Sequence, residues 1–312
     1  FKKGHIVREE DIPALLSVGK KHLYVWEKQE GILHENEAAE ILYRISADIH
    51  MHGSDIKEGK IELIADCDGV LKIRRDALLA VNSLGEMMIA SRHGDFPVKK
   101  GDKIAGTRII PLVIEKSKMD KAEKVAGTKP IFSILPYRSK KVGIITTGSE
   151  VQKGLIKDTF TPVLKEKLDE FSCQILGQTL PGDERSQITS DILSFIDQGA
   201  DMVICSGGMS VDPDDRTPGA IKDTGAEVVT YGAPVLPGAM LLLSYYQNND
   251  KIIPILGLPG CVMYARRTVF DLILPRIMAD DRICADEIAS YGEGGLCLNC
   301  DVCTFPNCGF GK

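Results

Sequence analysis

The sequence predicts an α/β protein in which a doubly wound, mostly parallel sheet follows an N-terminal α+β domain and precedes a short cysteine-rich tail. From about residue 139, short apolar segments alternate with amphipathic helical segments. This alternation specifies parallel strands whose sheet is covered by helices on both faces. Nearer the N-terminus, short strand-like and helix-like segments alternate less regularly, as in α+β domains. A chain of 312 residues is also long enough for two domains.

The α+β domain is expected over residues 1–115. Apolar residues recur at helical spacing in two segments, 31–52 and 74–85, which are predicted to be helices. The predicted strands are the β-rich segments 61–66, 69–73, 86–91 and 103–115. The Lys-rich segment 116–130 has few large apolar residues, so it is the predicted domain boundary, with an exposed helix as the alternative.

The second domain, with the parallel sheet, is expected over residues 139–280. Its predicted strands are 141–147, 173–179, 201–208, 226–230, 239–246 and 251–257. Its predicted helices are 158–171, 183–199 and 261–279. In the second of these helices, Ile188, Ile192 and Phe195 fall on one face, which is typical of a helix that buries a stripe against a sheet.

Charge and hydropathy argue against two classes of partner. The formal net charge is -6, whereas a general nucleic-acid binder needs a basic face that neutralises phosphates. No apolar run approaches the roughly 20 residues of a membrane-spanning helix. Nothing in the sequence resembles a secretory signal. We therefore expect a cytoplasmic protein that binds neither nucleic acid nor membrane.

Three glycine-containing turns stand at the ends of predicted strands. They are Thr147-Gly148-Ser149-Glu150, Ser206-Gly207-Gly208-Met209-Ser210 and Gly257-Leu258-Pro259-Gly260. Glycine lets the backbone approach a ligand closely and leaves N–H groups free to bind an anion. In a doubly wound sheet, ligands bind beyond the carboxyl ends of the strands, where these turns should meet. Each turn alone is more typical of a chain reversal than of a site, but three at one edge indicate a binding site.

Acidic residues accompany two of these turns. Glu150 ends the first turn, and Asp214 and Asp215 follow the second. Mg²⁺ prefers oxygen ligands such as carboxylates, and it commonly lies beside a bound phosphate. The sequence therefore predicts a magnesium site formed by these three carboxylates.

The segments TTGSEV, SGGMSVDPDDRTPGA and LGLPGCVMYARRTVFDLILPRI, in this order, resemble the molybdopterin-binding domain shared by the molybdopterin adenylyltransferases and the molybdenum-insertion proteins of cofactor assembly. The resemblance implies that the protein binds molybdopterin, that Asp215 and Glu150 have catalytic or metal-linked roles, and that ATP or AMP and molybdate are further substrates. It also implies a homo-oligomer. The residues that it implies in contact with the pterin or its phosphate are Thr147, Gly148, Ser149, Ser206, Gly207, Gly208, Ser210, Thr217, Pro237, Gly238, Gly257, Pro259 and Gly260.

Several departures from the family pattern bear on the activity. The opening KKGHIVREEDIPALLSVGKKHLYV resembles the segment that directly precedes the first turn in the insertion proteins, yet a long stretch separates the two here. Ala239 follows Pro-Gly where those proteins have Lys, so a cation suited to molybdate or phosphate is missing. Cys261 replaces an Asn after the third turn. Arg266 and Arg267 in the last predicted helix are the candidates to restore positive charge.

Three functions remain open on this basis. The first is a transferase that adds AMP to molybdopterin or inserts molybdenum, which the retained acidic residues favour. The second is a non-catalytic molybdopterin carrier or sensor, which the missing Lys and the cysteine-rich tail favour. The third is a nucleotide pyrophosphatase, as in competence-damage-type relatives of the same fold. Fold alone does not separate the three.

The tail, residues 281–312, ends in a compact set of four cysteines. They are Cys297, Cys300, Cys303 and Cys308, whereas the other five of the nine cysteines are scattered. Bacterial ferredoxins begin a [4Fe–4S] site with similar spacing, and four thiolates also bind tetrahedral Zn²⁺. Zinc ribbons usually separate two C-x₂-C pairs by a longer loop, so an iron–sulfur cluster is favoured over zinc. A tail of free thiols is the alternative.

Overall fold

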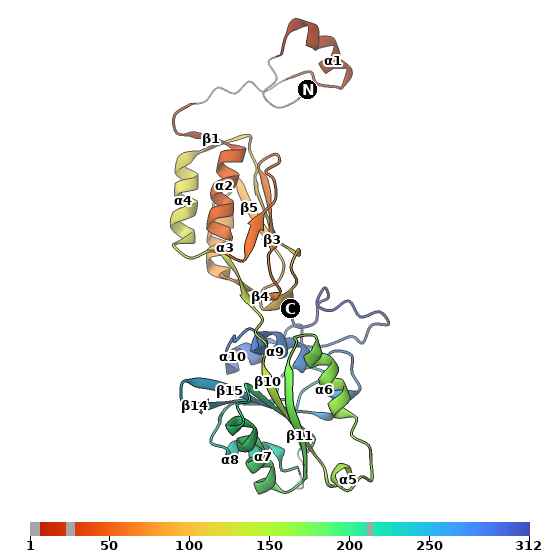
Figure 1. The fold of residues 1–312 in the computed structure, drawn as a ribbon. Helices are drawn as coiled ribbons and strands as arrows, with labels where there is room; N and C mark the ends of the chain where they lie inside the picture. The colour runs from red at the N-terminus through yellow and green to blue at the C-terminus, as the bar shows by residue number, and fades with distance from the viewer. Residues whose placement is uncertain (1–6, 23–28, 211–214) are drawn as a thin grey trace.

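The computed structural model describes residues 7–22, 29–210 and 215–312 (Figure 1). The first of these ranges contains the short helices η1 (Glu9–Asp11) and α1 (Ile12–Ser17). Pro13 lies in the first turn of α1, and Gly19 follows the helix with a φ of +78°. A glycine in the left-handed region is favoured just after the end of a helix, and Gly19 occupies this position.

Residues 29–136 form the α+β domain. Its elements are β1 (Ile32–His34), α2 (Glu35–Ser46), β2 (Met51–Gly53), β3 (Lys60–Ala65), β4 (Gly69–Ile73), α3 (Arg75–Asn82), β5 (Met87–Ser91), β6 (Phe96–Val98), β7 (Lys103–Ile109), β8 (Val113–Glu115), α4 (Lys116–Ala126) and β9 (Phe132–Pro136). The larger sheet has the order β2-β3-β7-β5 and is antiparallel throughout. Two smaller antiparallel sheets, β6-β4-β9 and β1-β8, complete the domain.

The predicted domain boundary at residue 115 is too early. The Lys-rich segment 116–130 contains α4, which packs against α2 and α3. Met119, Ala122 and Ala126 lie on one face of α4 and are fully buried in the core of the first domain. Small alanines let helices approach closely, so this helix needs few large apolar residues. The first domain therefore extends through β9.

The second domain is the predicted α/β domain. Its elements are β10 (Lys141–Thr147), α5 (Ser149–Gln152), α6 (Phe160–Asp169), β11 (Gln174–Gly182), α7 (Arg185–Asp197), β12 (Met202–Ser206), α8 (Thr217–Asp223), β13 (Glu227–Tyr231), β14 (Leu242–Asn248), β15 (Lys251–Leu258), η2 (Gly260–Met263), α9 (Val269–Met278) and α10 (Ala285–Ser290). The sheet has the order β11-β10-β12-β15-β14-β13. The first four strands are parallel, and β14 pairs antiparallel with β15 and β13, so the predicted mostly parallel sheet is confirmed.

Successive residues of the central strands face two different cores. Ile144 of β10 packs in the core that contains α6 and α9, while Ile145 packs in the core that contains α7 and α8. Figure 1 shows α7 and α8 on one side of the sheet and α9 on the other. Strands that are buried on both faces read as continuous apolar runs, which is why β10 is recognisable in the sequence.

The predicted helix 261–279 is wrong in its first half. The chain forms η2, then an irregular segment, and α9 begins only at Val269. A capping box sets this start: the Thr268 side chain accepts a hydrogen bond from the Phe270 N–H, and the Asp271 carboxylate accepts one from the Thr268 N–H at 2.8 Å. Arg266 and Arg267 therefore precede the helix.

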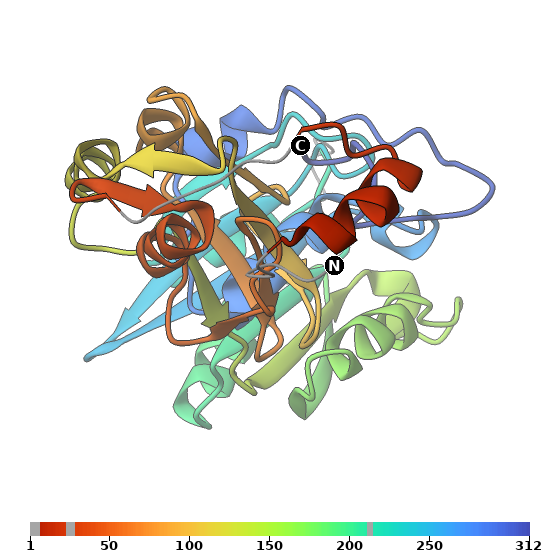
Figure 2. The ribbon, with the colours of Figure 1, turned by 90° about the horizontal axis from the view of Figure 1, so that it is seen from above.

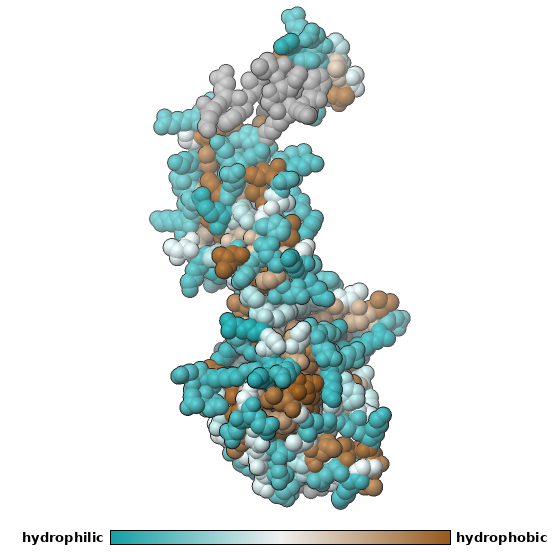
Figure 3. Space-filling view, in the orientation of Figure 1, coloured by the Kyte–Doolittle hydropathy of each residue, from teal (hydrophilic) through white to brown (hydrophobic). Residues whose placement is uncertain are grey.

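The cysteine-rich tail lies at the junction of the two domains, where the chain also ends (Figure 1). Seen from above, the tail extends to one side as a long loop (Figure 2). Phe310 is buried, and Phe305 packs between Phe310 and Phe96 of β6, with ring centroids 6.1 and 6.2 Å apart. The tail also exposes large apolar side chains, among them Leu298, whereas much of the visible surface of the domains is hydrophilic (Figure 3). Within the described ranges, no helix is long and apolar enough to cross a membrane.

Candidate functional site

The three predicted turns begin side by side at one edge of the sheet. Thr146 of β10 pairs in register with Ser206 of β12, and Ser206 pairs with Leu258 of β15. The sheet continues from β10 to β11 on one side and to β12 on the other. Open α/β sheets bind ligands in the crevice outside the carboxyl ends of the strands at such a reversal, which here means the ends of β10 and β12.

Buried hydroxyl groups join the turns at this crevice. The Thr217 hydroxyl donates to the Gly207 carbonyl at 2.9 Å and lies 3.2 Å from the Thr147 hydroxyl. Thr147 also donates to the Ser206 carbonyl at 3.3 Å. Thr217 is the first residue of α8, so these contacts fasten the start of that helix to the ends of two strands. Because each hydroxyl is buried and has a partner, the arrangement is fixed before any ligand arrives.

The paired glycines of the second turn are required by close packing. Gly207 has a φ of +88° and Gly208 a φ of +57°. A Cβ on Gly207 would lie 2.8 Å from the Thr147 carbonyl oxygen, and one on Gly208 would lie 2.8 Å from the Thr217 hydroxyl. Any larger residue would therefore separate the turn from β10. Contact of these glycines with a pterin stays a prediction.

The first turn is held by an aspartate that is not among the predicted site residues. The Ser149 N–H donates to the Asp183 carboxylate at 2.8 Å, so this N–H is occupied rather than free for an anion. Asp183 directly follows Gly182 of β11, and Gly182 pairs in register with Thr147. In the sequence, only the position of Asp183 shortly after the predicted strand 173–179 could have indicated this contact.

The predicted magnesium ligands have different surroundings. Glu150 is exposed and Asp215 is half-buried, and no other described residue forms a hydrogen bond or an ion pair with either carboxylate. Asp214 lies outside the described residues. Across the described ranges, no three His, Cys, Asp or Glu side chains are placed to hold a metal ion. The magnesium site stays a prediction.

Tyr231, the last residue of β13, forms hydrogen bonds with the second turn. Its hydroxyl donates to the carbonyls of Met209 and Ser210 at 3.0 and 3.2 Å. Burial, together with the negative charge of Asp215, raises the pKa of Tyr231, which keeps the hydroxyl protonated as a donor. No local pattern in the sequence indicates this contact, because β13 reaches the turn only through the folded sheet.

The Pro237-Gly238 turn, in contrast, lies against the tail and α9. A Cβ on Gly238 would lie 2.5 Å from Val269, the first residue of α9. Leu236 exchanges two backbone hydrogen bonds of 2.8 Å with the tail, one with Gly295 and one with Cys297. Pro237 lines a pocket whose other walls come mainly from the tail.

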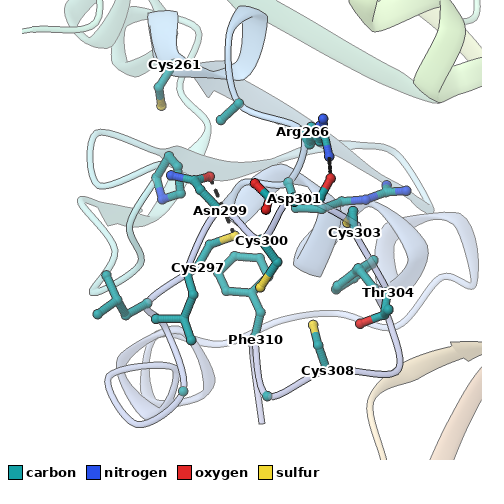
Figure 4. Close-up of a pocket in the computed structure, with 18 of the residues that line it drawn as sticks. Cys261, Arg266, Cys297, Asn299, Cys300, Asp301, Cys303, Thr304, Cys308 and Phe310 are labelled. Atoms are coloured by element: carbon teal, nitrogen blue, oxygen red, sulfur yellow. Dashed lines mark hydrogen bonds between the residues drawn. The ribbon is translucent and has the colours of Figure 1, made fainter.

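This pocket of about 690 Å³ contains all four tail cysteines and, on the facing wall, Cys261 (Figure 4). Arg266 donates to the Asp301 carbonyl at 2.7 Å. Arg267 forms a 2.8 Å ion pair with Asp271 and stacks over Phe305, 5.0 Å from its centroid. Both arginines therefore line the cysteine pocket, and each already interacts with other residues of the chain.

Several known proteins are similar to this chain in sequence. The family described as "Probable molybdopterin binding domain" matches residues 143–279, and a domain of unknown function matches residues 1–27. A molybdopterin molybdenumtransferase of Synechococcus elongatus is 25% identical over 193 residues, which cover 59% of this chain and 44% of that protein. The enzyme of the same name from Haemophilus influenzae is 28% identical over 236 residues, which cover 73% of this chain and 54% of that protein.

A CinA-like protein of Mycolicibacterium gilvum is 37% identical over a shorter stretch of 79 residues, which cover 25% of this chain and 19% of that protein. The chain thus spans about half the length of the two transferases that it matches. The three turns of the crevice all lie inside the range that the family model matches. Over residues 143–279 this chain is therefore similar to the molybdopterin-binding domain family.

Proposed function

We propose that this chain binds molybdopterin at the carboxyl ends of β10 and β12 and acts on it as a transferase of molybdenum-cofactor assembly. One observation carries the proposal: Thr147, Gly207 and Thr217 converge where the strand order reverses. The family match supports the ligand class, and the names of the two relatives support the reaction class. Adenylyl transfer and molybdenum insertion are the two reactions proposed within this class, and a homo-oligomer is proposed from the family resemblance.

In this proposal Glu150 and Asp215 hold Mg²⁺ beside the phosphate of the pterin. Both side chains are accessible and lack a partner among the described residues, and carboxylate oxygens suit this ion. The ion would neutralise phosphate charge during transfer. Thr147 and Thr217 keep the two turns at a fixed separation, so the chain contributes a preformed crevice.

A second candidate is a molybdopterin carrier or sensor without transferase activity. Ala239 follows the Pro237-Gly238 turn, so that turn presents no cation of its own. Arg267 does not supply one, because it is committed to Asp271 and Phe305, and Arg266 is hydrogen-bonded to the Asp301 carbonyl of the tail. This shortage of positive charge for molybdate or phosphate favours the carrier over an insertion enzyme.

The test begins with the full chain, purified without oxygen and titrated with molybdopterin by calorimetry. ATP with Mg²⁺, or molybdate with Mg²⁺, is then added, and the pterin products are separated and identified by mass spectrometry. The Asp215→Ala variant should bind molybdopterin but form no product. Asp197→Ala is the matched control, because Asp197 is an exposed aspartate at the end of α7.

Each outcome separates the candidates. Product that disappears only in Asp215→Ala supports the transferase. Binding without product supports the carrier or sensor. Failure to bind molybdopterin refutes the proposal, and release of pyrophosphate or nucleoside monophosphate from nucleotides alone would then support the pyrophosphatase.

A further inference from the structure

The four tail cysteines face one pocket in the folded protein. Sequence spacing shows only that they are near each other along the chain. In the structure, Cys297, Cys300, Cys303 and Cys308 all line the same cavity, and Cys261 reaches it from the segment after β15 (Figure 4). All nine cysteines are free thiols, so none of the four is held in a disulfide.

Backbone hydrogen bonds hold the tail at both ends, and between them it has no regular secondary structure. At one end the Cys297 N–H donates to the Leu236 carbonyl at 2.8 Å, and at the other the Gly311 N–H donates to the Gly294 carbonyl at 2.9 Å. Residues 297–309, all of which are described, contain no helix or strand. Cys300 and Cys303 are exposed. The cysteine side chains can therefore shift toward one another without breaking a helix or a sheet ladder.

The surroundings of the pocket suit a negatively charged centre. Four thiolates around a divalent ion, or around a [4Fe–4S]²⁺ cluster, leave a net charge of about -2. The Arg266 guanidinium lines the pocket, bonds to the Asp301 carbonyl at 2.7 Å and has no carboxylate partner among the described residues. Its positive charge is thus available to offset such a centre.

We infer that this pocket is a thiolate metal site in which Cys297, Cys300, Cys303 and Cys308 bind one zinc ion or one iron–sulfur cluster. Because no three acidic, histidine or cysteine side chains in the described ranges are yet placed to hold a metal, binding must draw the tail together. The thiols release their protons as they bind. Cys261 then forms the wall between this centre and the third glycine turn.

The inference goes beyond the proposed function and does not depend on it. Cys261 directly follows Gly260, the last residue of the third turn, and Leu258 of that turn pairs in register with Ser206. The metal centre would therefore adjoin the edge of the sheet that is proposed to bind the pterin. Its existence can be tested with no pterin present.

The experiment uses the full chain, reduced and free of metal. One portion is titrated with Co²⁺, the spectroscopic substitute for Zn²⁺, and the thiolate-to-cobalt absorption is recorded before and after Zn²⁺ is added. A second portion is incubated without oxygen with ferrous iron and sulfide, desalted, and analysed for absorption, iron and sulfide. Cys300→Ser and Cys303→Ser are the test variants. Cys284→Ser is the matched control, because Cys284 is exposed and lies outside the pocket.

We expect one centre per chain in one of the two portions, which also identifies the metal. Affinity or cluster content should fall roughly tenfold or more in both test variants and remain unchanged in Cys284→Ser. Matching circular dichroism spectra of the metal-free proteins establish that the variants are folded. The inference is overturned if neither portion forms a metal centre. It is also overturned if Cys300→Ser and Cys303→Ser bind as much metal or cluster as the wild-type protein. Loss in Cys261→Ser with retention in Cys300→Ser overturns the ligand assignment.

Discussion

Replacement of Gly207 by alanine tests whether the close approach of the second turn to β10 shapes the crevice. Gly207 has a φ of +88°, a conformation that costs an L-residue about 1 kcal/mol. The added Cβ would also lie 2.8 Å from the Thr147 carbonyl oxygen and 2.9 Å from its hydroxyl. Overpacking of this kind typically costs about 1–3 kcal/mol. Gly207→Ala should therefore destabilise the second domain by about 2–4 kcal/mol.

The chain offers a matched control that measures the cost of a positive φ alone. Gly199, after α7, has a φ of +87°, and a Cβ added there would have no neighbouring atom within 4 Å. Gly199→Ala should therefore lose only about 1 kcal/mol. Native-state hydrogen exchange in urea, followed on peptides from β10 and β12, measures the free energy of unfolding of this domain without contributions from the first. Equal losses in the two variants would show that the turn relaxes freely, and the packing argument would then be wrong.

Three further predictions concern stability. Thr217→Val removes the hydroxyl that bonds the Gly207 carbonyl and should cost about 1–3 kcal/mol by the same exchange measurement, whereas a near-neutral result would mean that water replaces the bond. Arg276→Leu should cost about 3 kcal/mol in urea unfolding, because Arg276 is 2% exposed and its removal leaves the Asp281 carboxylate, 2.6 Å away, without this partner. Burial raises the pKa of Glu287, but bonds from the Cys284 N–H and Arg276 outweigh it and lower the pKa overall. Glu287 therefore contributes stability above the pKa of an unfolded glutamate and loses it as the pH falls through the lower folded value, so Glu287→Gln should flatten the acid limb of the stability profile.

The strands and turns of the second domain are predictable because their sequence signals are local. A strand buried on both faces is an apolar run, and a turn with positive φ needs glycine, so β10 and Gly207 can be identified in the sequence. The contacts of Asp183 and Tyr231 cannot be predicted in this way. They depend on β11 and β13 lying next to particular strands, and strand order is a property of the whole sheet.

Two errors in the predicted boundaries have a common physical cause. The lysines of α4 dominate its composition and favour a linker, although Met119 and Ala122 form a narrow buried face. The segment before the last helix also contains apolar residues, and these favour a longer helix. The helix nevertheless begins at Val269, because Thr268 and Asp271 form a capping box there. In each case a few side chains at fixed spacing decide the structure. The average composition of the segment, on which the prediction rested, hardly reflects them.

The Leu236–Gly238 turn contacts the tail and α9, and its Pro237 and Gly238 are two of the residues that the family resemblance implies in contact with the pterin. Leu236 is bonded to the tail through Gly295 and Cys297, while the Pro237 carbonyl accepts a 3.1 Å hydrogen bond from the N–H of Val269 at the start of α9. A metal that draws the tail together must pull on this turn, because Cys297 is both an anchor of the tail and a proposed ligand. Metal loading should therefore change the affinity for molybdopterin. Calorimetric titration of the loaded and metal-free protein measures this coupling, and the ratio of affinities should return to one in Cys300→Ser. Equal affinities in the loaded and metal-free wild-type protein would show that the turn isolates the two sites from each other.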